Sequence, residues 1–436
     1  MTLEKSVSLE EGLLQLLQRL GITQAHMAAY LPRDWGGFVF QHPEAVASLT
    51  LVSPWTIKKE VLRPKASRLM VITGDHGGGA EQILRAVKEL PGANLLRLRD
   101  YYSPMWADVI ADRAEEIGSS MLDFLAQGEN PLEPLTLPEG EGEVAGISYR
   151  IRGSGPPLVL FPLGLAPSQW EPLLPRLSAH YCTITLGGPR VGMVAFLEAR
   201  GPGYLRVVRS VVNEMSPQAG QRLLEVGCGA GTVARWLARY TETRNPIVGV
   251  DVNSYLLREA ASLAKKEGLE DSIEWRHGNG EELPFPDRAF DAAMAFTVME
   301  EGDADRMLVE CTRVTKPGGK VAVIVRSLDM PWWVNLPLSA ELKRKSETHQ
   351  GDVVKGGCAD ASLYPRMQRV GLTEVAMLPQ WATFGEGERL SDQQERVAAT
   401  LSDSELEEWE TAVAAARADG SSFISQPFHC AVGTKP

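Results

Sequence analysis

One stretch constrains the fold of this 436-residue chain more than any other, the run QRLLEVGCGAGTVARWLARY at residues 221–240. An apolar segment leads into Glu225, glycines follow at positions 227, 229 and 231, and a segment with helical spacing of apolar residues comes next. Glycine lets the backbone turn tightly and approach a ligand closely, and a helix N-terminus presents free N–H groups to an anion. The stretch therefore predicts a strand, a ligand-binding turn and a helix.

The surroundings of this glycine loop define it further. A dinucleotide site has the spacing Gly-x-Gly-x-x-Gly, which would place the third glycine at Thr232, whereas this chain has Gly231. A second buried strand, NPIVGVDVN, ends at Asp251, twenty residues after Gly231. Strands and helices then alternate regularly to the C-terminus, which predicts an α/β fold with a parallel, doubly wound sheet.

This series of motifs resembles the class I S-adenosylmethionine-dependent methyltransferases of the small-molecule group. The motifs are EVGCGAG, the strand ending at Asp251, the loop and strand LPF…FD, and the segment RVTKPGG. The resemblance covers residues 200–330 well and the following hundred more loosely. It implies a seven-stranded Rossmann-like sheet, S-adenosyl-L-methionine as the cofactor, and methyl transfer to a small-molecule acceptor, with no metal site.

The resemblance also assigns roles to residues at the carboxyl ends of the first four strands of this sheet. Glu225 and the loop backbone would hold the methionine moiety, and Asp251 would accept both ribose hydroxyls. Asn279 stands where many relatives have Asp, and its amide oxygen can still accept a hydrogen bond from the adenine. The expected cofactor-binding residues are Tyr204, Glu225, Gly227, Cys228, Gly229, Gly231, Asp251, Val252, Asn279, Gly280, Glu281, Phe296 and Thr297.

The acceptor site is less well marked in the sequence. Relatives often carry His in the loop after the fourth strand, where this chain has Glu301, next to Glu300, in VMEEGDAD. A solvated helix start is the expected role of these two acids, and contact with a cationic or hydroxylated acceptor is the alternative. A substrate insertion is expected at about residues 327–368. The candidates are Glu301, Asp329 and His349 for catalysis, and Trp332, Trp333 and Tyr364 for substrate binding.

The first 190 residues also alternate strands and helices, but in an unusual order. Segments within 1–127, beginning with LLQRLGITQAHMAAY, resemble the fifth to eighth strands of an α/β-hydrolase. Residues 143–190 resemble its first four strands, and the Pro-, Gly- and acid-rich stretch 128–142 is typical of a linker. The resemblance implies a lidless, circularly permuted hydrolase-like domain at 1–190, before a methyltransferase domain at 191–436. The alternative is two half-sheets, each completed by a partner chain.

The hydrolase site is predicted to be lost. DWGG places Asp34 at the nucleophile position in one alignment, and a second alignment places Leu31 there. The family's acid would fall near Gly77, just after Asp75 and His76, and DYYSPMW has no histidine where the family has its base. Without a base, an aspartyl ester would not turn over. We therefore expect a structural, capping or dimerising domain. The alternatives are a bifunctional enzyme that uses Asp34 and a regulatory protein that holds the cofactor without transferring methyl.

Composition restricts the partners of the chain. A net charge of −12 argues against a nucleic-acid partner, because phosphate binding needs a basic face. No apolar run approaches the length of a spanning helix, and the N-terminus lacks the layout of a signal peptide. Five scattered cysteines without a Cys-x-x-Cys pair predict reduced thiols and no zinc site. We expect a cytoplasmic protein that acts on a small molecule, and a homodimer through the first domain.

Overall fold

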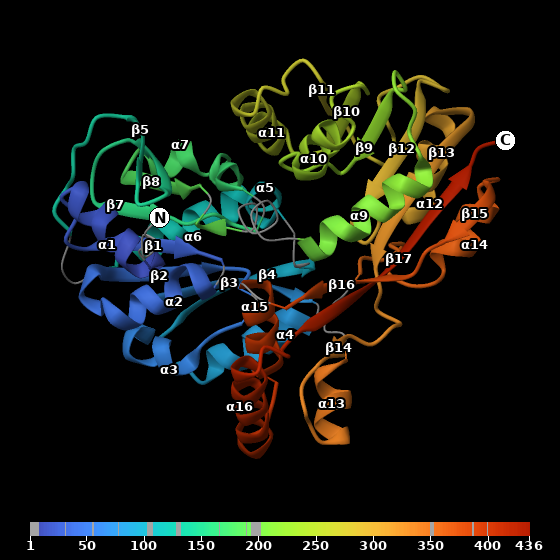
Figure 1. Cartoon of the computed structure of the whole chain (residues 1–436). Coiled ribbons are helices and arrows are strands. Elements are labelled where there is room, and N and C mark those ends of the chain that lie inside the picture. The colour runs from blue at the N-terminus through green and yellow to red at the C-terminus, as the bar shows by residue number, and fades with distance from the viewer. Residues whose placement is uncertain are drawn as a thin grey trace, which may run out of the picture. The chain divides into compact units, whose positions relative to one another are not determined.

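The chain folds into two compact units, Met1–Ala199 and Arg200–Pro436, each of which is considered by itself. Both units are α/β, with helices packed on the faces of a sheet (Figure 1). The computed structural model describes residues 8–30, 32–54, 56–76, 78–102, 108–127, 132–164, 166–188, 190–192, 202–348, 353–385, 388–398 and 400–436.

The first unit is built on an eight-stranded sheet in the order β4-β3-β2-β1-β7-β8-β6-β5. Neighbouring strands are parallel except that β6 is antiparallel to both β5 and β8. The strands are β1 (Ala25–Ala29), β2 (Val46–Val52), β3 (Leu69–His76), β4 (Asn94–Tyr102), β5 (Gly140–Val144), β6 (Ile147–Arg152), β7 (Pro157–Leu160) and β8 (Cys182–Gly187). The helices are α1 (Leu9–Arg19), α2 (Pro32–Gln41), α3 (Lys59–Leu62), α4 (Gly78–Lys88), α5 (Val109–Asp112), α6 (Ala114–Leu125) and α7 (Leu174–Leu177).

The pairing of β1 with β7 joins segments that lie more than a hundred residues apart in the sequence. Met27 lies opposite Val159 in this parallel pair, and both strands are completely buried. A permuted domain at 1–190 requires the segment AHMAA, within 1–127, to pair with PLVLFP, within 143–190, and the structure has this pairing. The sheet is complete within a single chain, so the alternative of two half-sheets completed by partners is wrong.

Part of the predicted linker at 128–142 forms hydrogen-bonded pairs with other segments of the first unit. Residues 128–131 lie outside the described residues, but Leu135 exchanges two backbone hydrogen bonds with Gly155, at 2.8 and 3.1 Å. Strand β5 then begins at Gly140 and pairs along its whole length with β6. The glycines here are compatible with a strand because β5 lies at the edge of the sheet and has only one partner strand.

The second unit contains a nine-stranded sheet whose main path is β11-β10-β9-β12-β13-β17-β14. Strands β11 to β13 along this path are parallel, and β17 is antiparallel to β13. The strands are β9 (Leu223–Val226), β10 (Ile247–Asp251), β11 (Ile273–His277), β12 (Phe290–Phe296), β13 (Thr315–Arg326), β14 (Trp333–Val334), β15 (Thr373–Met377), β16 (Gln380–Phe384) and β17 (Ile424–Thr434).

The prediction of seven strands is therefore two too few. Each neighbour pairs with only part of the 11-residue strand β17. On one side β13 pairs with its second half and β14 with its start, and on the other side β15 and β16 divide it in the same way. The additional strands β14 and β16 thus extend the sheet past the end of β13.

Helices cover both faces of this sheet, as a doubly wound fold requires. One buried cluster joins α9, α10 and part of α11 to one face, and a second joins α12 and α14 to the other. The helices are α9 (Pro202–Met215), α10 (Thr232–Tyr240), α11 (Ser254–Lys266), α12 (Ala304–Val314), α13 (Ala340–Ser346), α14 (Leu363–Arg369), α15 (Glu388–Ala398) and α16 (Asp403–Ala418).

A third cluster of this unit is built from helices α13, α15 and α16 together with Trp332, β14 and the start of β17. The sequence analysis did not anticipate α15 and α16. It also placed all of residues 327–368 in one insertion, whereas Leu363 and Met367 of α14 are buried in the main core of the sheet. The helices added to the doubly wound sheet therefore come from two separate parts of the chain, α13 from the first and α15 and α16 from the second.

Candidate functional site

The glycine loop connects β9 to α10, as predicted. Gly227 and Gly231 both have left-handed backbone conformations, with φ of 72° and 75°. A Cβ at Gly227 would lie 2.4 Å from Cγ2 of Val298, and one at Gly231 would lie 2.3 Å from the ring of Trp275. Glycine is required at both positions because the loop turns sharply and is packed closely from behind.

Asp251 ends β10 and fixes this loop from the neighbouring strand. Its Oδ2 accepts the N–H of Gly229 at 2.8 Å, and its Oδ1 accepts the N–H of Asn253 at 2.9 Å. Burial raises the pKa of Asp251, although these backbone N–H groups oppose the shift. Each carboxylate oxygen can accept more than one hydrogen bond, so the two oxygens of Asp251 can each accept a further bond from a ligand hydroxyl. Beside it, Val252 is 54% exposed and offers an apolar surface.

Glu225 lies at the start of the loop and is almost completely buried, with 4% of its surface exposed. Burial raises its pKa to about 8, and Asp251 contributes in the same direction, against the N–H of Ala234 and the charge of Arg235. Its Oε2 has no hydrogen-bond partner among the described residues. A buried carboxylate oxygen without a partner is costly, which indicates a place for a ligand donor or an ordered water.

Tyr204 and Thr297 meet at the carboxyl end of β12. The hydroxyl groups of the two residues lie 3.3 Å apart, and the Tyr204 ring packs against Phe428 at 5.5 Å. Thr297 has a φ of 54°, an unusual conformation for a β-branched residue, immediately after the buried Phe296. Strained backbone of this kind is concentrated at functional sites. The fold thus brings Tyr204, Phe296 and Thr297 together at the edge where the loop and Asp251 lie.

The segment from Asn279 to Asp287 crosses the same edge and is fixed by α12. The amide oxygen of Asn279 accepts the N–H of Glu281 at 2.9 Å, and the exposed amide group remains accessible. Glu281 itself points to α12, where it accepts the N–H of Asp303 and pairs with Arg306. Any contact of Glu281 with an adenine at this edge would therefore come from its backbone. A Cβ at Gly280 would lie 2.8 Å from Val226, so the segment packs tightly on the end of β9.

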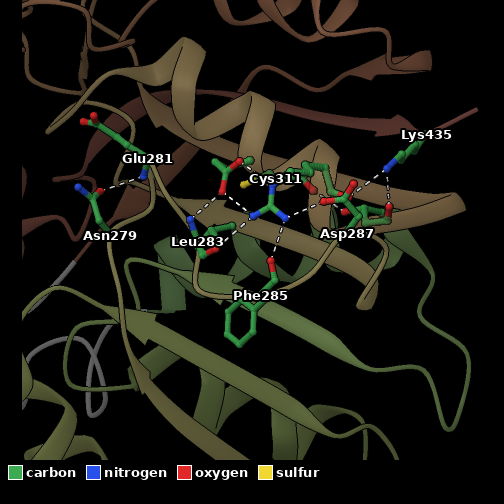
Figure 2. A network of polar contacts seen from close by, with 10 residues as sticks. Asn279, Glu281, Leu283, Phe285, Asp287, Cys311 and Lys435 are labelled. Atoms are coloured by element: carbon green, nitrogen blue, oxygen red, sulfur yellow. Dashed lines mark hydrogen bonds and ion pairs between the residues drawn. The ribbon is translucent and has the colours of Figure 1, made fainter.

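Arg313 of α12 is the anchor of this segment. Figure 2 labels Leu283, Phe285 and Asp287, the residues of the segment that take part in this network of polar contacts. Its guanidinium donates to the carbonyls of Leu283 and Phe285, at 3.1 and 2.8 Å, and to Asp287 at 2.9 Å. It also binds both carboxylate oxygens of Glu310 at 2.7 Å, and Glu310 accepts the N–H of Leu283. Hydrogen bonds and charge from Glu310 and Asp287 raise the pKa of Arg313. These contacts hold the loop in one conformation.

Glu300 and Glu301 do not form the solvated helix start that the sequence analysis expected. Helix α12 begins later, at Ala304, and Glu300 is only 2% exposed. Its Oε1 accepts the backbone N–H and the Nε of Arg326, at 2.7 and 3.2 Å, and its Oε2 has no hydrogen-bond partner in the described part of the chain. Glu301 lies 3.5 Å from the same guanidinium, and burial raises its pKa to about 7. The expectation failed because these acids are held by a tertiary contact, with Arg326 at the end of β13.

The two tryptophans proposed for substrate binding differ in their surroundings. Trp332 is 5% exposed and packs into the core of the added helices, so the assignment of its side chain to an acceptor surface is wrong. Trp333 is 53% exposed and its ring lies 5.8 Å from that of Phe423. Trp333 alone of this pair presents an aromatic surface to solvent.

Asp329 and Tyr364 are joined by a residue that the sequence analysis did not single out, His429 of β17. Nε2 of His429 lies 2.7 Å from Oδ1 of Asp329, and Nδ1 lies 2.9 Å from the Tyr364 hydroxyl. Burial opposes ionisation of Asp329, but bonds from Ser327, Ala361 and His429 lower its pKa to about 2. This chain of contacts ties the start of the insertion and helix α14 to the sheet. The third catalytic candidate, His349, lies outside the described residues.

Within its described residues, the corresponding edge of the first unit shows no assembled hydrolase site. Helix α2 begins at Pro32, so Asp34 is the third residue of a helix and does not occupy the turn after β1; its side chain is outside the described part. Asp75 accepts the N–H groups of Asp100 and Tyr101, both at 3.1 Å, and lies 3.1 Å from His76. These contacts use both carboxylate oxygens of Asp75 to join the ends of β3 and β4. The positions Leu31 and Gly77 lie outside the described residues.

Comparison with known proteins agrees with the geometry of the second unit. Residues 224–323 match the family model described as a methyltransferase domain. This segment runs from β9 to β13 and contains the glycine loop, Asp251 and the Glu300–Glu301 pair. The chain therefore carries a Rossmann-like domain that matches the methyltransferase family model, at the position predicted from the sequence.

Several relatives share this domain. The chain is 31% identical over 147 residues to a sterol 24-C-methyltransferase of Aspergillus fumigatus, covering 34% of this chain and 36% of that one. It is 39% identical over 106 residues to a 2-phytyl-1,4-naphtoquinone methyltransferase of Synechocystis sp., covering 24% and 44%. Among solved structures, the [4+2]-cyclase SpnF is 25% identical over 53% of this chain and 81% of that one, with a TM-score of 0.34. The chain spans about a third to a half of the length of the curated relatives it matches.

No helix in the described ranges is both long enough and apolar enough to cross a bilayer.

Proposed function

We propose that the second unit binds S-adenosyl-L-methionine and transfers its methyl group to a small-molecule acceptor. The observation that supports this most is the combination at one sheet edge of the glycine loop, Asp251 and the partnerless Oε2 of Glu225. The residues suit such a ligand. Asp251 has acceptor capacity for the two ribose hydroxyls, Val252 offers apolar surface for the adenine, and Glu225 can accept from or pair with the cationic methionine end.

In this proposal the residues of the chain act mainly by positioning and by excluding water. Bound S-adenosylmethionine supplies an activated methyl group. The loop, Asp251 and the Asn279 segment fix the ligand, while Tyr204, Phe296 and Thr297 form the wall at the end of β12. Alignment of reactants in a dry site can supply most of the acceleration of a displacement reaction. The relatives named for sterols and naphtoquinones make an apolar small molecule a reasonable acceptor class.

Calorimetric titration with S-adenosylmethionine tests the proposal. Loss of the bonds to the ribose in Asp251→Ala should weaken binding by about 1.5–3 kcal/mol, or roughly ten- to a hundredfold. Asp271→Ala, at an exposed position before β11, is the matched control and should bind as the wild type does. Unchanged affinity of the Asp251 variant would mean that the ligand site lies elsewhere. Formation of S-adenosylhomocysteine in the presence of an acceptor would separate an enzyme from a regulatory protein that only holds the cofactor.

We also propose that the first unit is a circularly permuted, lidless α/β-hydrolase-like domain without hydrolase activity, which caps the acceptor site or forms a homodimer. Its order β4-β3-β2-β1-β7-β8-β6-β5 supports this, because it places the segment resembling the family's third strand beside the one resembling its fifth. The position of Asp34 within α2 argues against the bifunctional alternative. Turnover of an ester, epoxide or halide that Asp34→Asn abolishes would revive that alternative. Light scattering of the full chain and of one lacking residues 8–192 tests the dimer.

A further inference from the structure

Three polar side chains from separate elements of the second unit form a chain of hydrogen bonds on one face of its sheet. Asp329 comes shortly after β13, His429 lies in β17, and Tyr364 belongs to α14. Helix α14 packs against β15 and β17 (Figure 1). Nε2 of His429 lies 2.7 Å from Oδ1 of Asp329, and Nδ1 of the same ring lies 2.9 Å from the Tyr364 hydroxyl. Both ring nitrogens are therefore engaged, one with an acid and one with a phenol.

The direction of these hydrogen bonds follows from the charge on Asp329. Although burial opposes its ionisation, hydrogen bonds lower the pKa of Asp329 to about 2, so this carboxylate only accepts. Nε2 of His429 therefore carries the proton of the bond to Asp329. In the neutral imidazole the other nitrogen, Nδ1, has a lone pair and accepts the proton of the Tyr364 hydroxyl. The chain thus runs from the phenol through the imidazole to the carboxylate.

An arrangement of this kind activates a hydroxyl group as a nucleophile. A hydroxyl can attack when an adjacent imidazole takes its proton and a carboxylate holds that imidazole in one tautomer. Burial raises the pKa of Tyr364 to about 12, so the phenol keeps its proton at neutral pH and depends on His429 for its removal. His429 is 4% exposed, whereas Tyr364 is partly exposed. Of these two residues, only Tyr364 is therefore open to a reactant.

Two exposed apolar side chains lie on the same face of the sheet, beside His429. Met377 is paired with Ala431 and Trp381 with Pro427, the residues two positions after and two positions before His429. Residues opposite each other in an antiparallel pair point to the same face, as do residues two apart along one strand. Met377 is 56% exposed and Trp381 is 45% exposed. Large side chains at such diagonal positions are within reach of one another, so an apolar surface adjoins the chain of hydrogen bonds.

We propose that Asp329, His429 and Tyr364 form a second reactive centre, at which the Tyr364 hydroxyl accepts an apolar acyl group from an activated donor, a thioester or an aryl ester. Oη of Tyr364 forms a bond to the carbonyl carbon, and the bond from that carbon to the sulfur or oxygen of the donor breaks. The phenolic proton passes to Nδ1 of His429 and from there to the leaving group, while Asp329 stabilises the imidazolium. Met377 and Trp381 contact the apolar part of the acyl group. The centre is independent of the proposed methyl transfer, since it uses none of the residues assigned to S-adenosylmethionine.

Acylation of the full chain by p-nitrophenyl octanoate, followed by peptide mapping with mass spectrometry, tests the proposal. Tyr240 is the reference within the same molecule, because it is also partly exposed but its hydroxyl donates to the amide oxygen of Asn213, at 2.6 Å, instead of to an imidazole. We expect acylation of Tyr364 to be at least about tenfold faster than that of Tyr240, since a positioned base contributes at least this much. Equal rates in the wild type would mean that the three residues form structural hydrogen bonds only, and the proposal would be wrong.

Variants of the chain separate the relay from packing. His429→Gln keeps a polar side chain in the strand and should bring the rate at Tyr364 to within about twofold of that at Tyr240. Asp329→Asn presents an N–H to the ring and favours the wrong tautomer, so it should lower the maximal rate of acylation without changing the ester concentration that gives half of it. Unchanged maximal rates in both variants would overturn the proposed relay, whatever their effect on Tm.

The length of the acyl chain tests the apolar surface. At equal low concentration, the octanoyl ester should acylate Tyr364 at least about threefold faster than the acetyl ester, because additional methylene groups are removed from water. Trp381→Ala should remove this difference. Val309→Ala is the control, since Val309 of α12 is similarly exposed, at 52%, and the variant should keep the difference. Fast acylation of Tyr364 without preference for the longer chain would overturn the assignment of an apolar acyl group.

Discussion

Arg313 offers a sharp test of how the loop at the ligand edge is held. The guanidinium is 29% exposed, and its main partner Glu310 is 14% exposed. Arg313→Met removes a bidentate charged pair, worth about 1.5–3 kcal/mol, and the donors to two backbone carbonyls, worth about 0.5–1.5 kcal/mol each. Water can replace part of this at a partly exposed site, so we expect a loss of about 2–4 kcal/mol in the free energy of unfolding. For a unit of this size that lowers Tm by roughly 5–12 °C.

Differential scanning calorimetry of the full chain measures this change, with the transition of the first unit as an internal reference. Arg369→Met is the control, because Arg369 and its partner Asp305 are both more than half exposed, and it should change Tm by no more than about 2 °C. Adding Glu310→Met to Arg313→Met should restore part of the loss, since it removes a carboxylate left without its cation. The reasoning is refuted if the Arg313 and Arg369 variants melt at the same temperature.

Three further results are expected. Gly227→Ala should abolish S-adenosylmethionine binding and lower Tm, because its Cβ would lie 2.4 Å from Val298. The control is Gly268→Ala, which also has a positive φ, of 68°, but has nothing within 4 Å of the added Cβ; it should show only the cost of the strained backbone and bind normally. Equal effects of the two variants in thermal melts and titrations would contradict this. Unfolding of the ligand-free second unit should become easier as the pH rises from about 4.5 to about 8. The unfolded chain ionises both acids from their ordinary pKa of 4.5, whereas burial in the folded unit holds the pKa of Glu301 at about 7 and that of Glu225 at about 8, so Glu225→Gln should flatten a plot of Tm against pH over this range. Trp332→Ala should lower the free energy of unfolding in urea by about 3–5 kcal/mol, and Trp333→Ala by less than about 1 kcal/mol. Similar urea midpoints for the two variants would argue against the assignment of Trp332 to the core.

The parts of the site that the sequence predicted are those encoded by local order. A strand, a glycine turn and a helix are adjacent in the sequence, so residues 221–240 specify that part of the site directly. Asp251 could be predicted because parallel strands bring their carboxyl ends to one edge. In the first unit, the resemblance to the strand order of the α/β-hydrolases predicted that Ala25–Ala29 and the strand at 157–160 share one sheet, which they do.

The missed parts depend on contacts between distant segments. Arg326 holds Glu300 buried and Glu301 partly buried where a solvated pair was expected, and nothing near position 300 encodes that contact. His429 sits in an apolar strand and meets Asp329 only through the antiparallel pairing of β17 with β13. Trp332 and Trp333 are neighbours in the sequence but face opposite ways on an extended segment, so composition could not tell them apart.

The place of β17 in its sheet has a consequence for the synthesis of the protein. This strand is flanked by β13 and β14 on one side and by β15 and β16 on the other, yet it follows all of them along the chain. The sheet of the second unit therefore cannot close until residue 434 has left the ribosome, and the β13 edge stays open until then. In the first unit every strand is available once Gly187 has emerged. The nascent chain should thus acquire its first folded unit well before the second, with the ligand edge among the last features to form.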